Sequence, residues 1–303
     1  MIEPEEISLV ALNKPTKIRV ITNWTDSFSI HDRIIDQFMT AKHFKDNVEF
    51  VVDDSYEWLV VFNSKGSFDI KVPKERVIGF IQEPPDHNFF DRNIGSYCSV
   101  VYTCAEPYAY RIDGNLVGFP MGMFYHLDGE LEEFMTAPQK SAQISMITSN
   151  ISGGFYEYRI RLARELAQTG WCSVYGRGLN FKGVKGELSN KATGLLPFRF
   201  SVCIENGIWD DYISDKIIDA ALCSCVPIYV GARNIKQHVP FAIELENFRN
   251  SKYAVKEIEH ILQSTNYDDF IQPIKAWKKK YMSKHNIYEK IKDFIHEATN
   301  RVH

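Results

Sequence analysis

Apolar and polar positions alternate along most of the chain in a way that predicts strands and helices in turn. In the first half, runs rich in β-branched and aromatic residues predict strands over 17–22, 48–52, 57–63, 76–82, 99–103 and 116–119. The stretch from Ser29 to Phe44 has apolar residues at helical spacing and predicts a helix. Strands that alternate with helices are typical of a parallel sheet with crossover helices.

A polar stretch from Gly129 to Gln143 interrupts this pattern and is interpreted as an interdomain linker. Beyond it, strands are predicted over 142–148, 171–176, 198–204 and 226–231, and helices over 155–168, 254–264, 268–282 and 286–299. We therefore predict an α/β protein with two doubly wound, Rossmann-like domains, over 1–135 and 140–283, and a C-terminal amphipathic helix over 284–303. Ligands of such sheets bind at the C-terminal ends of the strands, which we expect to face a cleft between the domains.

The predicted C-terminal helix carries an apolar stripe of Ile287, Ile291 and Ile295 with lysines beside it. A basic amphipathic helix can lie on an anionic membrane surface, which here would be the inner face of the membrane, or it can pack across the first domain. We favour packing, because the stripe is short and the helix also carries acidic residues.

Composition narrows the possible functions. The 303 residues have a hydrophobic content of 45% and a formal net charge of -4, which is typical of a globular protein and argues against a nucleic-acid partner. The start of the chain lacks a signal-peptide pattern, and no apolar run approaches the roughly 20 residues that span a bilayer, so we expect a cytoplasmic protein. The six cysteines form no CxxC pair and have no histidines at zinc spacing, so we expect reduced, buried thiols and no metal site.

The candidate chemistry lies in FSVCIENGIWDDYISDKIIDAALCSCVPIYVG, residues 200–231. A strand ends there at Glu205 and Asn206, and a helix is predicted to begin near Tyr212 or Ile213, with Asp210 or Asp211 as its cap. One narrow polar stripe on this apolar helix contains Tyr212, Asp215, Lys216 and Asp219. A helix N-terminus with a lysine in its first turn suits a phosphate, and the neighbouring aspartate suits sugar hydroxyls. A solvated helix face is the alternative interpretation.

The runs FRFSVCIEN, DYISDKIIDA and VPIYVG, in this order and with matching gaps, resemble the donor-binding signature of the α-1,3/4-fucosyltransferases, glycosyltransferase family 10. The resemblance implies a GT-B type fold, with two Rossmann-like domains facing across a cleft. It also implies that four residues bind the guanosine diphosphate part of the donor: Asn206, Tyr212, Asp215 and Lys216. Glu205 is either a sugar contact or a buried acid held by backbone amides.

Two segments before this run extend the resemblance. ITSNISGGFYEYRIRLARELAQ is similar to the family's strand, Ser-Asn turn and arginine-bearing helix, which implies that Arg159 contacts the donor diphosphate. VYGRG, residues 174–178, resembles the turn after that helix, which implies that the backbone at Tyr175 and Gly176 approaches the nucleotide.

In the predicted first domain, IGFIQEPPDHNFF resembles the segment in which the family carries a glutamate, and that position falls on Glu83. This acid directly follows a predicted strand, and two prolines make the turn after it rigid. A carboxylate at this place can accept the proton of an acceptor hydroxyl. An ordinary loop acid is the alternative, and His87 is the rival base. The run FPMGMFYH, 119–126, resembles the end of the family's first domain, with Pro120 at the cleft wall.

Together the residues and the resemblance imply an inverting glycosyltransferase that moves fucose from GDP-fucose to a hydroxyl of an oligosaccharide or lipopolysaccharide-type glycan. The sequence has no Asp-x-Asp triplet, so Arg159 and Lys216 are expected to act in place of a metal, with no cofactor. Ser214 and Asp215 stand where the family usually has Thr-Glu, so a donor with another GDP-linked sugar is one alternative. A nucleotide-sugar-binding protein without turnover is the other.

Overall fold

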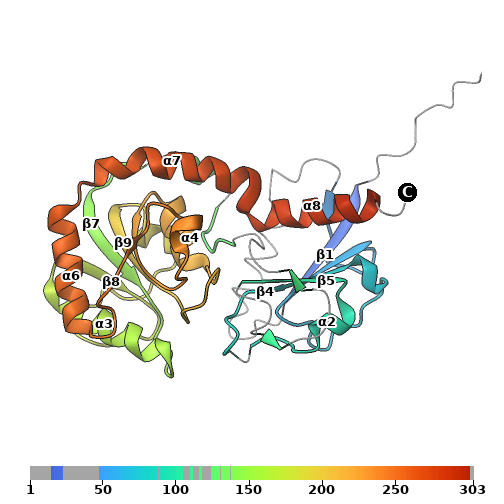
Figure 1. The fold of residues 1–303 in the computed structure, drawn as a ribbon, viewed down its shortest axis with the longest axis horizontal. Coiled ribbons are helices and arrows are strands. Elements are labelled where there is room, and N and C mark those ends of the chain that lie inside the picture. Colours follow the sequence, from blue (N-terminus) through green and yellow to red (C-terminus); the bar gives the residue numbers. More distant parts are fainter. Residues whose placement is uncertain are drawn as a thin grey trace, which may run out of the picture.

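Two parallel β-sheets form the centres of two domains (Figure 1). The computed structural model describes residues 15–22, 48–87, 89–104, 110–111, 116–117, 124–129, 131–136 and 138–300. The helix predicted over 29–44 and the position of Pro120 lie outside these residues. The first sheet has six strands in the order β2-β1-β3-β4-β5-β6, and the second has five in the order β11-β10-β9-β7-β8. The predicted α/β class with two doubly wound sheets is confirmed.

The first sheet is built from the six strands that the sequence predicted, all in parallel register. They are β1 (Thr16–Thr22), β2 (Val48–Phe50), β3 (Trp58–Phe62), β4 (Val77–Ile81), β5 (Val100–Thr103) and β6 (Leu116–Val117). Strands β3 and β4 read WLVVF and VIGFI and are buried along their whole length. Continuous apolar runs of this kind belong to parallel strands that are covered on both faces. The short helix α2 (Ile94–Tyr97) connects β4 to β5.

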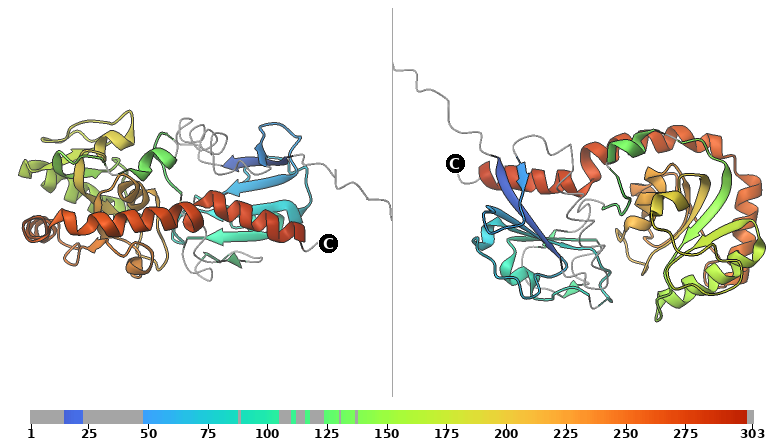
Figure 2. Two further views of the ribbon diagram at one scale, coloured as in Figure 1. Left: turned by 90° about the horizontal axis from the view of Figure 1, so that it is seen from above. Right: turned by 180° about the vertical axis from the view of Figure 1, so that it is seen from behind.

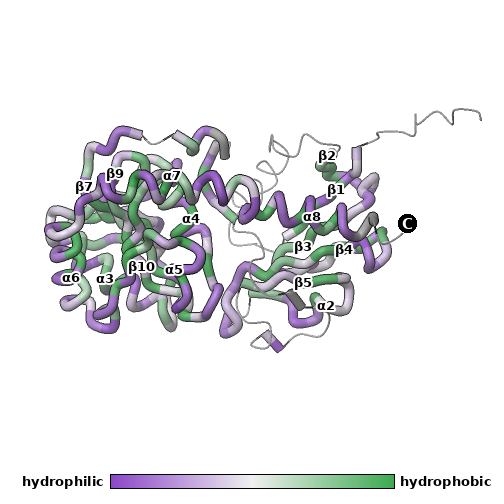
Figure 3. Tube along the Cα trace, turned by 45° about the horizontal axis from the view of Figure 1, so that its top comes forward, coloured by the Kyte–Doolittle hydropathy of each residue, from purple (hydrophilic) through white to green (hydrophobic). Residues whose placement is uncertain are grey.

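The second sheet is also parallel, with strands β7 (Ala142–Ile147), β8 (Cys172–Tyr175), β9 (Phe198–Ile204), β10 (Val226–Val230) and β11 (Ile243–Glu244). The helices around it are α3 (Phe155–Thr169), α4 (Asp215–Leu222), α5 (Ile235–His238) and α6 (Ser251–Ser264). Hydrophobic residues concentrate in the strands of both sheets, and the outward faces of the helices are hydrophilic (Figure 3). The six cysteines are unpaired and buried, as expected.

Two helices near the C-terminus connect the domains. Helix α7 (Ile271–Lys280) lies along the second domain, and after a π-helical turn (Tyr281–His285) helix α8 (Ile287–Asn300) runs back over the first domain (Figures 1 and 2). The rings of Trp58 and Phe294 meet edge to face at 5.9 Å, and the predicted stripe of isoleucines in α8 is buried. The packing that the sequence favoured for this helix is confirmed. Among the described residues, we find no helix with the length and apolar character needed to cross a bilayer.

The segment between the sheets is attached to α7 by a buried lysine. A 3-10 helix (Leu131–Met135) lies in the predicted linker. Lys278 of α7 is 1% exposed, and its ammonium donates hydrogen bonds to the Phe134 carbonyl at 2.6 Å and to Ser224 Oγ at 2.7 Å. The exact domain limits of 135, 140 and 283 stay a prediction, and the two sheets lie on either side of this segment.

The predicted start of α4, near Tyr212 or Ile213, is wrong by two or three residues. The helix begins at Asp215, and its N-cap is Ser214, whose hydroxyl accepts a hydrogen bond from the Lys216 amide. Asp211 instead accepts hydrogen bonds from Asn234 and His238, and Asp210 pairs with Arg233. All these side chains are good caps by residue type, and tertiary contacts decide between them.

Candidate functional site

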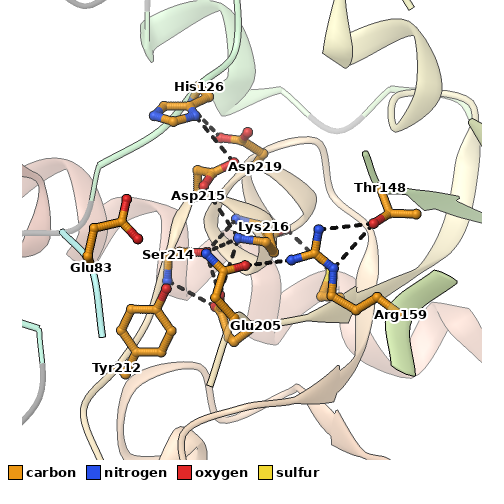
Figure 4. Close-up of polar contacts among 12 residues, drawn as sticks. Glu83, His126, Thr148, Arg159, Glu205, Tyr212, Ser214, Asp215, Lys216 and Asp219 are labelled. Atoms are coloured by element: carbon orange, nitrogen blue, oxygen red, sulfur yellow. Dashed lines mark hydrogen bonds and ion pairs between the residues drawn. The ribbon is translucent and has the colours of Figure 1, made fainter. Parts of the chain in front are cut away.

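Polar side chains gather at the C-terminal edge of the second sheet (Figure 4). They come from the ends of β7 and β9, from α3 and from the N-terminus of α4. Neighbouring strands of a parallel sheet end at the same edge, so these residues meet although they are far apart in the sequence. The cluster contains most of the site residues predicted in this domain, together with several that were not predicted.

Arg159 is the best-anchored cation of the cluster. It is 4% exposed, and its Nε and Nη2 both donate to Thr148 Oγ1, at 3.2 and 3.0 Å. Nη1 donates to Asn206 Oδ1 at 2.5 Å, and the guanidinium lies 4.7 Å from the ring centre of Tyr156. Burial lowers the pKa of Arg159, and nearby Glu205 opposes that shift. The side chain is thus held in one orientation, with its charge directed to the end of β9.

Glu205 stabilises the turn that leads into α4. The side chain is fully buried, and its carboxylate accepts hydrogen bonds from the Ser214 amide at 2.9 Å and from Ser214 Oγ at 2.5 Å. The hydroxyl of Tyr229 donates to it at 3.4 Å, and Lys216 Nζ lies 3.6 Å away. These contacts fit the second alternative given above, a buried strand-end acid, although hydroxyls supply two of its donors where amides were expected.

Lys216 occupies the first turn of α4, and its backbone amide donates to the hydroxyl of the N-cap Ser214. Its ammonium donates to Ser214 Oγ at 3.0 Å and lies 4.0 Å from Asp215 Oδ1. The side chain is 22% exposed, so part of it faces solvent. A cation at a helix N-terminus adds to the positive end of the helix dipole, which favours an anionic ligand at this place.

Asp215 is surrounded by positive charge. Its Oδ2 lies 2.5 Å from Lys191 Nζ and 3.4 Å from His126 Nδ1. Burial would raise the pKa of Asp215, but the charges of His126, Lys191 and Lys216 outweigh burial and hold it well below its usual value. The carboxylate is therefore charged and is already engaged by protein groups.

Asp219 lies one helical turn further along α4 and is fully buried. Lys191 donates a hydrogen bond to its Oδ2 at 2.5 Å, and the backbone amide of His126 donates to Oδ1 at 2.8 Å. Burial and the neighbouring Asp215 raise the pKa of Asp219. Burial would lower the pKa of Lys191, but the two aspartates outweigh that effect and raise it. Through these contacts, Asp219 connects α4 to Lys191 and to the segment around His126, which leaves the first domain.

The remaining predicted residues of this domain lie around the cluster. Tyr212 precedes α4, is 1% exposed, and burial raises its pKa well above the usual value. The Tyr175 carbonyl at the end of β8 accepts a hydrogen bond from the Thr148 amide at 3.0 Å. A Cβ at Gly176 would lie 1.5 Å from the Thr148 carbonyl oxygen, so this glycine is needed for the close approach of two backbone segments. That requirement holds whether or not a nucleotide binds there.

Glu83 lies on the first-domain side of the cluster, beyond the end of β4 (Figure 4). Its carboxylate is 16% exposed and lies 3.9 Å from His87 Nδ1. His87 Nε2 is 3.1 Å from the hydroxyl of Tyr156 in α3, a hydrogen bond between the two domains. The predicted acid and its rival base are therefore neighbours, and His87 joins Glu83 to the helix that carries Arg159.

Four residues of the site were not predicted from the sequence: His126, Thr148, Lys191 and Ser214. Asp219 was predicted only as part of the polar stripe. Ser214 had a local signal, since serine next to a helix start is a common N-cap. Lys191 and His126 had none, because their partners Asp215 and Asp219 are distant in the sequence and His126 comes from beyond the first sheet.

On the side of the second sheet, the site offers the cations Arg159 and Lys216 beside the N-terminus of α4, with Glu205 and Asp215 as neighbouring acids. The Glu83 carboxylate lies on the side of the first domain. Arg159 and Lys216 suit a diphosphate, because guanidinium and ammonium groups donate several hydrogen bonds to phosphate oxygens. Glu83 is placed to hold or accept a proton at the boundary between the domains.

Comparison with known proteins gives this geometry a context. The model of the family described as "Glycosyltransferase family 10 (fucosyltransferase) C-term" matches residues 137–300, more than half of the chain. An α1,3-fucosyltransferase solved with GDP is 16% identical and has a TM-score of 0.54, with 94% of this chain and 95% of that one covered. The same kind of enzyme with GDP-fucose is 17% identical with a TM-score of 0.50, over 91% and 92% of the chains.

A third solved structure, a glycosyltransferase from Rickettsia africae ESF-5, is 8% identical and has a TM-score of 0.55. It covers 95% of this chain and 99% of its own. At such low identities the likeness concerns the fold, and it confirms the predicted GT-B type arrangement of two Rossmann-like domains.

Proposed function

This chain belongs to glycosyltransferase family 10, and from that membership we propose that it transfers fucose from GDP-fucose to a hydroxyl of a glycan acceptor, with inversion at the anomeric carbon. The observation that carries the proposal is that two cations of the second domain lie opposite a carboxylate of the first domain. Arg159 and Lys216 lie at the edge of the second sheet, and the Glu83 carboxylate lies on the first-domain side. The likeness in fold to α1,3-fucosyltransferases solved with GDP and with GDP-fucose supports the choice of donor.

The donor half of the proposal uses the edge of the second sheet. Arg159 is held by Thr148 and Asn206, and in this proposal it donates its remaining N–H groups to the diphosphate. Lys216 and the amides at the N-terminus of α4 contact the same phosphates. We assign the nucleoside to the surroundings of Tyr175, Gly176, Tyr212 and Asp215, with Asp215 accepting from a ribose hydroxyl.

The acceptor half uses Glu83. In the proposed step, the acceptor hydroxyl gives its proton to the Glu83 carboxylate while its oxygen forms a bond to the anomeric carbon. The bond from that carbon to the phosphate oxygen breaks on the opposite face, and GDP leaves with the electron pair. Arg159 and Lys216 stabilise the charge that builds on the leaving phosphate, and fixed charges of this kind are often the largest contribution to catalysis.

We further propose that the reaction needs no metal ion, since positively charged side chains stand where the diphosphate is expected. The acceptor is proposed to be an oligosaccharide or a lipopolysaccharide-type glycan.

One observation favours a second candidate, transfer of a different GDP-linked sugar. Asp215 stands where the family usually has glutamate and is paired with Lys191 and His126. A shorter acid that is already engaged by Lys191 and by the His126 imidazole offers the donor a different set of hydrogen-bond partners, so the sugar preference is tested together with the nucleotide.

A thermal-shift screen of GDP, UDP, ADP and CMP tests the donor assignment. We expect GDP to raise the unfolding temperature most, because a ligand that binds only the folded state stabilises it. GDP-fucose is then compared with GDP-mannose at the same concentration, and GDP-fucose is expected to give the larger shift. A larger response to UDP or CMP than to GDP would refute the proposed donor.

A further inference from the structure

A cavity of about 270 Å³ is lined in part by the residues that follow Glu83 in the chain, and none of the residues assigned to the donor lines it. Its lining residues are Pro85, Asp86, Arg92, Arg111 and Trp209. Pro85 and Asp86 follow Glu83 closely in the chain, and Trp209 comes from the second domain, between β9 and α4. Trp209 Nε1 donates to Asp86 Oδ1 at 3.2 Å, so residues of both domains line the cavity and are in contact there.

The cavity has two exposed arginines whose charge is not compensated. In the part of the chain that the structure describes, neither Arg92 nor Arg111 has a carboxylate within 4 Å, whereas Arg233 pairs with Asp210 at 2.6 Å. Arg92 uses one N–H group for the Tyr110 carbonyl at 3.2 Å, which orients its guanidinium and leaves its other donors available. Asp86 offsets only part of the positive charge, and it already accepts from Trp209.

The remaining walls are apolar. The indole of Trp209 and the ring of Pro85 offer flat surfaces of the kind that line pockets for ring-shaped ligands. Guanidinium groups match the geometry of carboxylates and phosphates, with which they form paired, charge-assisted hydrogen bonds. The combination suits a sugar ring that carries a negative charge.

We propose that the acceptor carries an anionic group, a carboxylate or a phosphate, which binds Arg92 and Arg111 while a sugar ring packs against Trp209. The inference rests on the proposed function, because it takes Glu83 as the group that receives the acceptor hydroxyl. It adds the chemical class of the acceptor, since a neutral glycan offers neither arginine an anionic partner.

Binding to the full chain saturated with GDP tests this inference with three matched probes: methyl glucoside, methyl glucoside 6-phosphate and methyl glucuronide. Affinities are measured by ligand-observed NMR titration. We expect at least one charged probe to bind at least tenfold more tightly than the neutral one, and the two charged probes distinguish phosphate from carboxylate. The advantage is expected to shrink as salt is added, because exposed charges are screened.

Variants then locate the effect. Arg92→Gln and Arg111→Gln are each expected to reduce the advantage at least threefold, and the double variant is expected to remove it. Arg164→Gln, at an exposed arginine of α3, is the matched control and is expected to change nothing. GDP affinity, measured separately, is expected to stay the same in all variants.

Three results would overturn the inference. The first is that the charged and neutral probes bind equally or do not bind at all. The second is that the double variant keeps the advantage of the charged probe. The third is that the arginine variants weaken GDP binding, which would assign the cavity to the donor. Failure of the proposed function is a different result, since it appears as loss of GDP binding or of fucose transfer in the unaltered protein.

Discussion

The buried ammonium of Lys278 makes a prediction about stability that can be worked out from the structure. Lys278 is 1% exposed, and burial lowers its pKa from 10.5 to about 8, with neighbouring Lys140 adding to the shift. Each unit of pKa difference between the folded and unfolded states corresponds to about 1.4 kcal/mol. With its two hydrogen bonds in place, a charged Lys278 therefore costs the folded state about 3 kcal/mol at neutral pH relative to the neutral form.

The sign of the pH dependence follows from the proton count. Between about pH 8 and 10.5 the unfolded chain holds a proton on Lys278 that the folded chain has released, so stability rises with pH in this window. In Lys278→Met this contribution is absent, while the loss of donors to Phe134 and Ser224 is independent of pH. We expect the unfolding free energy of the wild type, relative to the variant, to rise by about 2.5 kcal/mol from pH 7 to pH 10.

Urea unfolding followed by far-UV circular dichroism at pH 7, 8, 9 and 10 measures this difference. Lys279→Met, at the exposed neighbour on the same helix, is the matched control and is expected to show a constant difference from the wild type. A constant difference for Lys278→Met as well, or a relative loss of wild-type stability above pH 8, would refute the reasoning.

Three further predictions concern the site. Arg159→Lys keeps the charge but loses the planar group that contacts Thr148 and Asn206 together, so calorimetry should show GDP binding at least tenfold weaker, with Arg164→Lys unchanged as a control. Gly176→Ala places a Cβ against the Thr148 carbonyl and should lower the unfolding free energy by about 3 kcal/mol, so unchanged stability would contradict the close approach. Asp215→Asn should destabilise the protein at pH 7, and the difference should shrink as the pH falls below about 4, because the unfolded carboxyl takes up its proton before the folded one; a difference that stays constant between pH 4 and pH 2 would contradict the low pKa of Asp215.

The sequence predicted elements well where local pattern and tertiary structure agree. Strands β3, β4 and β10 are apolar throughout because both faces are covered, and such runs are visible without any structure. Strand β11 has only two residues, so its apolar signal is too short to be recognised.

The site was predicted in part, for a related reason. Glu205 and Asn206 follow β9, and Lys216 lies in the first turn of α4, where ligands of parallel sheets bind. Arg159 lies within α3, and the structure brings it to the same place. The cap of α4 was misplaced because partners 23 and 27 residues away take up the Asp211 carboxylate.

The Lys191 contacts were not predictable either, because the partners of Lys191 are also distant in the sequence. Lys191 meets Asp215 and Asp219 only after a strand and a long turn have folded, and nothing in the residues next to it indicates that encounter. Tertiary ion pairs of this kind carry no periodic or local signature.

The central claim, that Glu83 receives the proton of the acceptor hydroxyl, is tested most directly by Glu83→Gln. This variant keeps the size of the side chain and removes the base, and general-base groups typically contribute 10²–10⁴-fold to the rate. Transfer from GDP-fucose to a glycan panel is measured by chromatography, GDP affinity is measured by calorimetry, and the exposed Glu75→Gln in the first domain serves as a control. We predict that Glu83→Gln loses at least a hundredfold in transfer while GDP binds as in the wild type; transfer within threefold of the wild type would contradict the claim.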